Sequence, residues 1–244
     1  MSAPLTTEAV DTMDRRPRPI DLLIRAQSRF PILQLAITAV AFLVGALTLD
    51  GFASANSVKS LLILASLVGL AGLGQTLAIL LGGVDMSVAN FLVVGAVFAT
   101  QITALHGISF ATAMLLLIPF TLVLGGFVGW VCHRYKVEPL VVTLAMGTFA
   151  LGLMQIQTEG TIAGGAPEWL MGLTSLRSTT FGMPFPPVLL IWVVVIVALA
   201  LFIHRTSVGR RMLAAGANDR AAGLSLIKVR RMWVIVFALS ALFA

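Results

Sequence analysis

Six long stretches without Asp, Glu, Lys or Arg constrain what this chain can fold into more than any other feature of its sequence. A helix needs roughly 20 residues to cross the hydrocarbon core of a bilayer. Continuous apolar runs of this length favour helices, because the strands of a membrane barrel alternate apolar and polar residues. We therefore expect an all-α fold, a polytopic helical membrane bundle with six spans, within residues 31–49, 60–84, 86–105, 107–132, 139–158 and 187–203.

The composition excludes an ordinary soluble protein. Hydrophobic residues make up 59% of the chain and charged residues 11%, against about 45 to 50% and about 25% in soluble domains. The net charge is +6, but the basic residues form short clusters between the apolar runs, so no nucleic-acid partner is expected. A single cysteine, Cys132, excludes an intrachain disulfide and a metal site built on cysteine pairs.

Lysine and arginine are unevenly distributed between the two sides of the predicted bundle. Cytoplasmic loops of membrane proteins carry the excess of these residues. A cytoplasmic N-terminus leaves only Lys59 and Arg177 outside. We therefore predict a cytoplasmic N-terminal segment over 1–30 and a transmembrane domain over 31–244. The basic residues on the cytoplasmic side are then Arg15, Arg16, Arg18, Arg25, Arg29, Arg134, Lys136, Arg205, Arg210, Arg211, Arg220, Lys228, Arg230 and Arg231.

A seventh apolar segment begins at Met232 and reaches Ala244, the last residue of the sequence. At 1.5 Å per residue, a helix over this segment reaches about 20 Å, which is less than a bilayer core. We expect it to be the start of a seventh span, belonging to a longer protein with further spans. Small residues one helical turn apart, such as Gly125 and Gly129, predict close helix packing.

The sharpest polar interruption lies between the second and third runs. Gly82 and Gly83 can end a helix, and Asp85 can cap the next one by accepting a backbone hydrogen bond from Ser87 or Val88. One interpretation is a tight cytoplasmic turn with Asp85 as the N-cap. The other is a role in a translocation path or gate, since ionisable groups within a membrane usually serve function. The two interpretations are compatible.

The loop after the sixth run is the most informative stretch. Residues 204–231 carry seven basic residues and one acidic residue, Asp219. The pattern predicts a short helix ending at Gly216, an N-cap at Asn218 and a second short helix. This second helix would present a small, partly apolar face formed by Ala221, Ala222 and Leu224. Either a partner protein or anionic lipid can cover such a face.

Three motifs, in the same order, resemble those of the permease subunits of ABC-type importers for ribose, xylose, arabinose, galactosides and related small molecules. GGVDMSVAN is similar to the family's GGIDLSVGS, and EPLVVTLAMG is similar to PPFIVTLGTM. TSVGRRMLAAGANDRAAGLSLIKVRR is similar to T-x-F-G-R-x-x-x-A-I-G-G-N-x-x-A-A-x-L-S-G-I-x-V. Together the motifs cover most of the chain from the second run onward.

The resemblance implies a role for each motif. Gly83, Asp85 and Ser87 match a helix break beside the translocation path, with Gly82 and Asn90 in the same stretch. The segment that docks into the ATPase is matched by Gly216, Asn218, Ala221, Ala222, Leu224 and Ser225. The implied partners are a cytoplasmic ATP-binding subunit, a periplasmic solute-binding protein, a second permease copy as homodimer or heterodimer, and the lipid of a bacterial inner membrane.

The chain also departs from the family's motifs. Ala89 and Asn90 replace Gly-Ser, which can alter the lining of the path. Glu138 replaces a proline, and Ala217 replaces the second glycine of its motif. Leu226 replaces the glycine before Ile227, a change that can stiffen or reposition the docking segment.

The function expected from these features is import of a sugar or similar small polar solute. The sequence lacks a G-x-x-x-x-G-K-[ST] phosphate loop, so ATP is expected on the partner subunit, with no cofactor on this chain. The alternative is an ion-coupled secondary transporter, for which Asp85 is the sole candidate coupling group. Catalysis and metal binding are not expected, because His106, His133 and His204 lie far apart.

Overall fold

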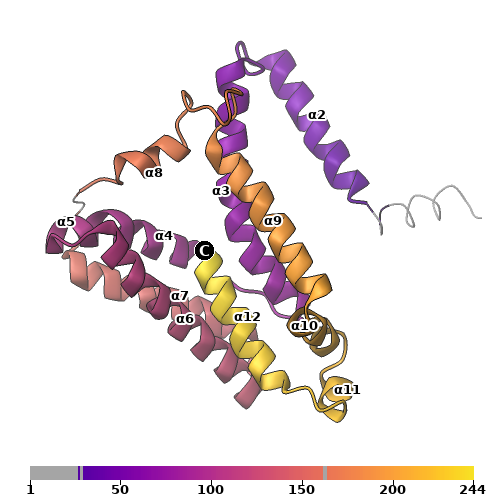
Figure 1. Ribbon diagram of the computed structural model, residues 1–244. Coiled ribbons are helices and arrows are strands. Elements are labelled where there is room, and N and C mark those ends of the chain that lie inside the picture. Colours follow the sequence, from indigo (N-terminus) through magenta and orange to yellow (C-terminus); the bar gives the residue numbers. More distant parts are fainter. Residues whose placement is uncertain (1–26, 28–29, 162–163) are drawn as a thin grey trace, which may run out of the picture. The chain divides into compact units, whose positions relative to one another are not determined.

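The computed structural model describes residues 27, 30–161 and 164–244 (Figure 1). In this part of the chain every named element is a helix, as the sequence predicts. The chain divides into two compact units, Met1–Val58 and Lys59–Ala244. Five helices of the described part are long and apolar enough to cross a membrane.

The first unit contains α2 (Ile32–Thr48), a helix of 17 residues over the first predicted span. It is shorter than the five candidate membrane spans, so the predicted count of six is not confirmed. The turn after α2 brings Phe52 back onto Phe42, with ring centroids 5.5 Å apart. The five arginines predicted to face the cytoplasm within 1–30 lie outside the described residues.

The five candidate spans are helices that begin and end near the predicted limits. They are α3 (Ala55–Leu80), α6 (Phe110–Tyr135), α7 (Pro139–Thr158), α9 (Pro187–Arg205), and a continuous segment made of α4 (Val88–Val97), the π-helix η2 (Phe98–Ile102) and α5 (Thr103–His106). Gly107, in the left-handed conformation, ends α5 as expected. The short helix α8 (Glu168–Leu173) lies in the connection before α9.

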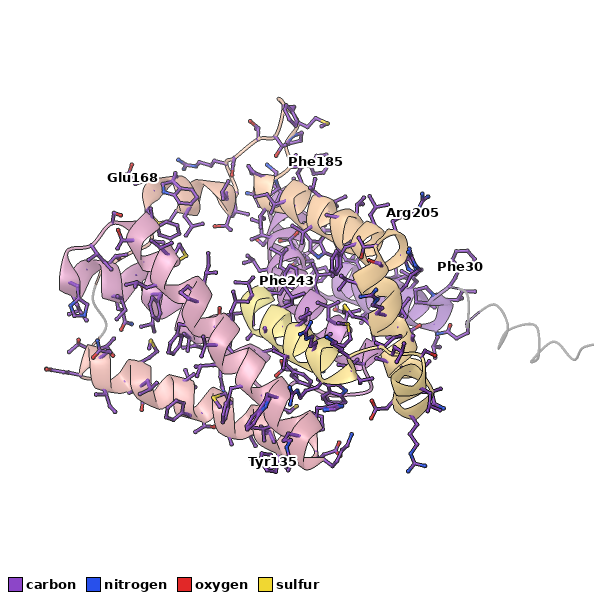
Figure 2. All side chains as sticks on the ribbon, turned by 60° about the horizontal axis from the view of Figure 1, so that its bottom comes forward. Phe30, Tyr135, Glu168, Phe185, Arg205 and Phe243 are labelled. Carbon is purple, nitrogen blue, oxygen red and sulfur yellow. The ribbon has the colours of Figure 1, made fainter. Side chains whose placement is uncertain are left out.

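Helix α12 (Val229–Phe243) forms from the seventh apolar segment and is the most deeply buried helix of the second unit. It packs along α6 through small residues: a Cβ added to Gly126 would meet Val234 at 3.5 Å. At Gly125 and Gly129 a side chain would collide with the backbone of α12. The two helices are antiparallel, and Figure 2 marks their C-terminal ends at Tyr135 and Phe243. The predicted close packing at Gly125 and Gly129 is therefore confirmed.

Candidate functional site

The interruption between α3 and α4 begins with a glycine that reverses the backbone. Gly82 has φ +85°, and its N–H donates to the Ile79 carbonyl at 2.9 Å. The N–H of Gly83 donates to the Ala78 carbonyl at 2.9 Å. These two bonds close a Schellman motif, in which a left-handed residue satisfies the last carbonyls of a helix. The prediction that this glycine pair ends a helix is confirmed, and Gly82 is the residue that does so.

Asp85 lies buried just after the break. Its Oδ1 accepts hydrogen bonds from the Ser87 backbone N–H at 2.8 Å and from Ser87 Oγ at 2.5 Å. Only 4% of Asp85 and 2% of Ser87 are exposed. The predicted bond from Ser87 is confirmed, but Asp85 is not the N-cap, because α4 begins at Val88 and its N-cap is Ser87. Asp85 instead fixes the turn that leads into the cap.

Side chains of two neighbouring helices hold the backbone of the break. Gln75 Oε1 of α3 accepts from the Asp85 backbone N–H at 3.2 Å. Thr143 Oγ1 of α7 accepts from the Met86 backbone N–H at 2.9 Å and donates to the Leu140 carbonyl at 3.2 Å. Buried backbone donors need such partners. The sequence analysis did not predict this bond from Thr143 to the break.

The remaining residues of the break pack against α7 and α12. A Cβ added to Gly83 would lie 3.1 Å from Phe237 of α12 and 3.3 Å from Pro139 of α7. Asn90 lies against Gly147 of α7, one turn into α4. Gly83, Asp85 and Ser87 are therefore buried together, whereas Gly82 is exposed and Asn90 lies at a separate α4–α7 contact.

The segment after α9 forms two short helices. The first, α10 (Ser207–Ala217), begins at Thr206, whose Oγ1 accepts from the Gly209 N–H at 3.0 Å. The prediction that this helix ends at Gly216 is wrong, because α10 continues through Ala217. Gly216 lies against the backbone at Leu80, where a side chain would collide with the Leu80 carbonyl. The glycine allows α10 to approach the end of α3.

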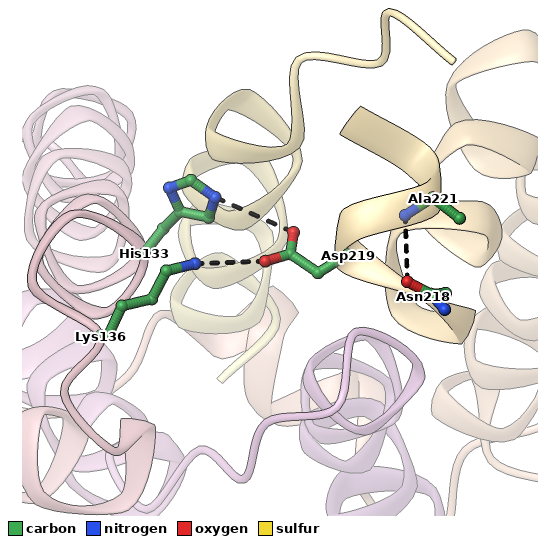
Figure 3. A network of polar contacts seen from close by, with 5 residues as sticks. All are labelled: His133, Lys136, Asn218, Asp219 and Ala221. Carbon is green, nitrogen blue, oxygen red and sulfur yellow. Dashed lines mark hydrogen bonds and ion pairs between the residues drawn. The ribbon is translucent and has the colours of Figure 1, made fainter. Parts of the chain in front are cut away.

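The second short helix, α11 (Asp219–Leu224), is capped as predicted. Asn218 Oδ1 accepts from the Ala221 N–H at 3.0 Å (Figure 3). Ser225 Oγ donates to the Ala221 carbonyl at 3.1 Å. The expectation that Ala222 lies on an exposed apolar face is wrong, since Ala222 packs into the core and is 4% exposed. Leu224, 87% exposed, does project from this helix.

Leu226 adds a second exposed leucine, 91% exposed, that the sequence did not single out as an apolar contact. It has φ +61°, and its N–H donates to the Gly223 carbonyl at 3.1 Å. The Ile227 N–H donates to the Ala222 carbonyl at 3.1 Å. Leu226 thus occupies the left-handed position of a Schellman motif, where glycine is favoured. We call Leu224 and Leu226 the leucine tip.

An ion pair links α11 to the end of α6. Lys136 Nζ donates to Asp219 Oδ2 at 3.1 Å, and His133 Nε2 lies 4.0 Å from Asp219 Oδ1 (Figure 3). The sequence predicted only that Lys136 lies on the cytoplasmic side. A separation of 83 residues left no local signal that could have revealed this contact.

No group of three or more His, Cys, Asp or Glu side chains that could hold a metal occurs within the part of the chain that the structure describes. The candidate functional sites are the buried break at residues 82–90 and the α10–α11 segment with its leucine tip.

Comparison with known proteins identifies the family. The model described as "Branched-chain amino acid transport system / permease component" matches residues 57–244. The chain belongs to this permease family. Permease components are transporters rather than enzymes, and the five apolar helices fit a multi-pass protein of the inner membrane.

Several relatives of this permease carry sugar names. The ribose import permease protein RbsC of Haemophilus influenzae is 30% identical over 218 residues, 87% of the chain and 66% of the relative. The L-arabinose ABC transporter permease protein AraH of Azospirillum brasilense is 28% identical, over 97% of the chain and 70% of the relative. The inner membrane ABC transporter permease protein YjfF of Escherichia coli is 27% identical, over 85% of the chain and 64% of the relative. The chain spans about two thirds of the length of these relatives. No solved structure gives a significant match.

Proposed function

We propose that this permease is the membrane-spanning subunit of an ATP-driven importer for a sugar or a similar small polar solute. The family and the relatives named as ribose and arabinose permeases support this assignment. In this proposal the chain performs no chemistry and binds no cofactor. A cytoplasmic partner subunit binds ATP, a periplasmic protein delivers the solute, and a second permease copy, identical or different, completes the path.

The observation that carries the proposal is the leucine tip. Leu224 at the end of α11 and Leu226 in the turn after it are almost fully exposed, and α11 is held in place by the Asn218 cap and by the buried Ala222. Two neighbouring apolar side chains that are exposed in a basic segment are suited to contact with another protein. The segment also carries basic residues, which favours the cytoplasmic side of a membrane. A cytoplasmic ATPase is therefore the partner that fits this tip best.

We place the translocation path beside the break at residues 82–90. The basis is the family resemblance of Gly83, Asp85 and Ser87 and the burial of these residues among α3, α4, α7 and α12. Breaks of transmembrane helices occur where backbone is buried in protein or lines a cavity. We also propose that α2 is the first of six spans, with the N-terminus in the cytoplasm and α12 as the start of a seventh span.

Uptake by reconstituted protein tests this function. Proteoliposomes that contain the permease, its ATPase and its binding protein should accumulate labelled D-ribose or L-arabinose only when ATP is present. Accumulation of either sugar without the ATPase, driven by a proton or sodium gradient alone, would contradict the proposal and support the ion-coupled alternative. The candidate coupling group of that alternative is Asp85, which is buried and whose Oδ1 accepts two hydrogen bonds from Ser87.

A further inference from the structure

We infer that Asp219 is a positioning residue, which ties the ATPase-docking helix α11 to the end of α6 through Lys136 and so transmits movement of the leucine tip into the bundle. This inference rests on the proposed function. It adds a specific route by which the docking segment acts on the spans.

The geometry joins two elements that are distant in sequence. Asp219 is the first residue of α11, directly after the Asn218 cap, and its two carboxylate oxygens face Lys136 and His133 separately (Figure 3). Lys136 directly follows α6 and has φ +56°. The hydrogen bond from Lys136 sets the distance between the start of α11 and the end of α6, and His133 lies beside the other carboxylate oxygen.

An open space lies beside α11 on the side that faces α6. A cavity of about 590 Å³ lies between α11, the end of α6 and the start of α12. Both His133 and Asp219 line this cavity, together with Gly223 and Ile227. Because the space beside α11 is not filled by packed side chains, the ion pair is the direct polar link across it.

A continuous set of contacts leads from α6 to the buried break. The glycines of α6 touch the backbone of α12, so α12 must follow any displacement of this face of α6. Phe237 of α12 in turn lies against Gly83, two residues before Asp85. Packed helices in contact through small residues transmit shifts because no soft side chains intervene. Movement of α11 thus has a physical route to the break.

The pair is suited to open and re-form during a transport cycle. The side chain of Lys136 is 67% exposed and that of Asp219 is 46% exposed. Ion pairs in such surroundings are weak because water competes for both charges. The contact therefore orients α11 without locking it.

Charge reversal in reconstituted transporter tests the inference. Lys136→Asp and Asp219→Lys, each alone, should lower the amount of D-ribose imported per ATP hydrolysed by about fivefold, the upper range for an exposed pair made repulsive. The double variant Lys136→Asp/Asp219→Lys restores an attractive pair and should recover most of the ratio. Arg134→Asp, an equal charge change two residues before Lys136, should leave the ratio at the level of the unmutated protein.

The outcomes distinguish the positioning role of Asp219 from the proposed importer function. If the single variants keep the normal ratio, or if the double variant stays as low as they are, the positioning role of Asp219 is overturned while the importer function stands. If the unmutated protein hydrolyses ATP without importing the probe sugars, and none is imported under any variant, the proposed function fails and the inference with it.

Discussion

At the scale of single residues, backbone conformation decides how the leucine tip is presented. Leu226 adopts the left-handed conformation with φ +61°, which costs a residue with a Cβ roughly 1 to 2 kcal/mol. The family's motif has glycine at this position. The chain therefore retains a strained leucine where glycine fits better, and that leucine is 91% exposed. An apolar side chain that is exposed even though its backbone is strained is suited to contact another protein.

The substitution Leu226→Gly should raise stability and weaken docking at the same time. Glycine relieves the left-handed strain, so we expect up to about 1 kcal/mol of stabilisation, reduced by the greater freedom of glycine in the unfolded chain. Thermal unfolding of the purified permease measures this change. The control Leu226→Ala removes the same side chain but keeps a Cβ, and should give no stabilisation. Equal unfolding temperatures for the two variants would contradict the strain argument.

At this scale, helix caps and helix ends could be predicted from the sequence, and contacts between distant residues could not. The Asn218 cap and the helix end at Gly82 depend on hydrogen bonds within a few residues, which sequence patterns reflect directly. The burial of Ala222 depends on how α11 lies against the core, and alanine is compatible with either environment. The Lys136 partner of Asp219 comes from another helix, so it has no local signature.

At the scale of elements, glycines of α6 determine how closely α12 can pack. In membranes small residues at helix contacts allow backbones to approach, and packing then stabilises the pair. Gly125 faces the backbone carbonyl of Phe237, and Gly129 faces that of Trp233. The α6–α12 pair is consequently a close contact between the helix end beside Asp219 and the buried break, in addition to the contact of Gly216 with Leu80.

The substitution Gly125→Ala should separate α12 from α6. Its Cβ collides with the Phe237 carbonyl, a rigid backbone atom, so we expect destabilisation of about 1 to 3 kcal/mol. The control is Gly152→Ala in α7, where no atom lies within 4 Å of the added Cβ. It should be neutral or slightly stabilising, because alanine favours helix. Unfolding in a denaturant series measures the free energy of unfolding of both variants. Similar losses of stability in the two would refute the close contact.

Helix positions were predictable from hydropathy, but helix ends were less so. The helix α7 has the predicted limits, because proline at its first position and a polar end coincide with the apolar run. By contrast, α3 includes Lys59, whose Nζ reaches the Leu176 carbonyl at 3.2 Å. A charge ends an apolar run without ending a helix. The π-helix at residues 98–102 left no recognisable pattern in the sequence.

At the scale of the second unit, the structure combines a buried polar break with the exposed leucine tip. The break is held by α3 and α7, and α12 connects it by contact to α6. Hydropathy predicted the membrane class, and the sequence predicted the helix end at residues 82–83 and the Asn218 cap. The roles of these segments in translocation and docking stay predictions. The orientation in the membrane remains a prediction from the distribution of basic residues.

Cysteine labelling should establish that orientation. In a Cys132→Ser background, a cysteine at Arg220 should not react with a membrane-impermeant maleimide in intact cells, whereas one at Arg177 should react. Both positions are exposed, so accessibility of the side chain is matched. Permeabilised cells should label both. Labelling at position 220 from outside would reverse the proposed topology.

The most direct test of the central claim is whether the leucine tip holds the ATPase. Purified with its partner ATPase, the unmutated permease should form a stable complex, and Leu224→Asp/Leu226→Asp should lose most of the bound ATPase while keeping its unfolding temperature, since both side chains are exposed. Phe181→Asp, at a position 88% exposed in the connection before α9, serves as the control and should retain the complex. Undiminished ATPase binding by the double leucine variant would contradict the claim that this tip is the docking site.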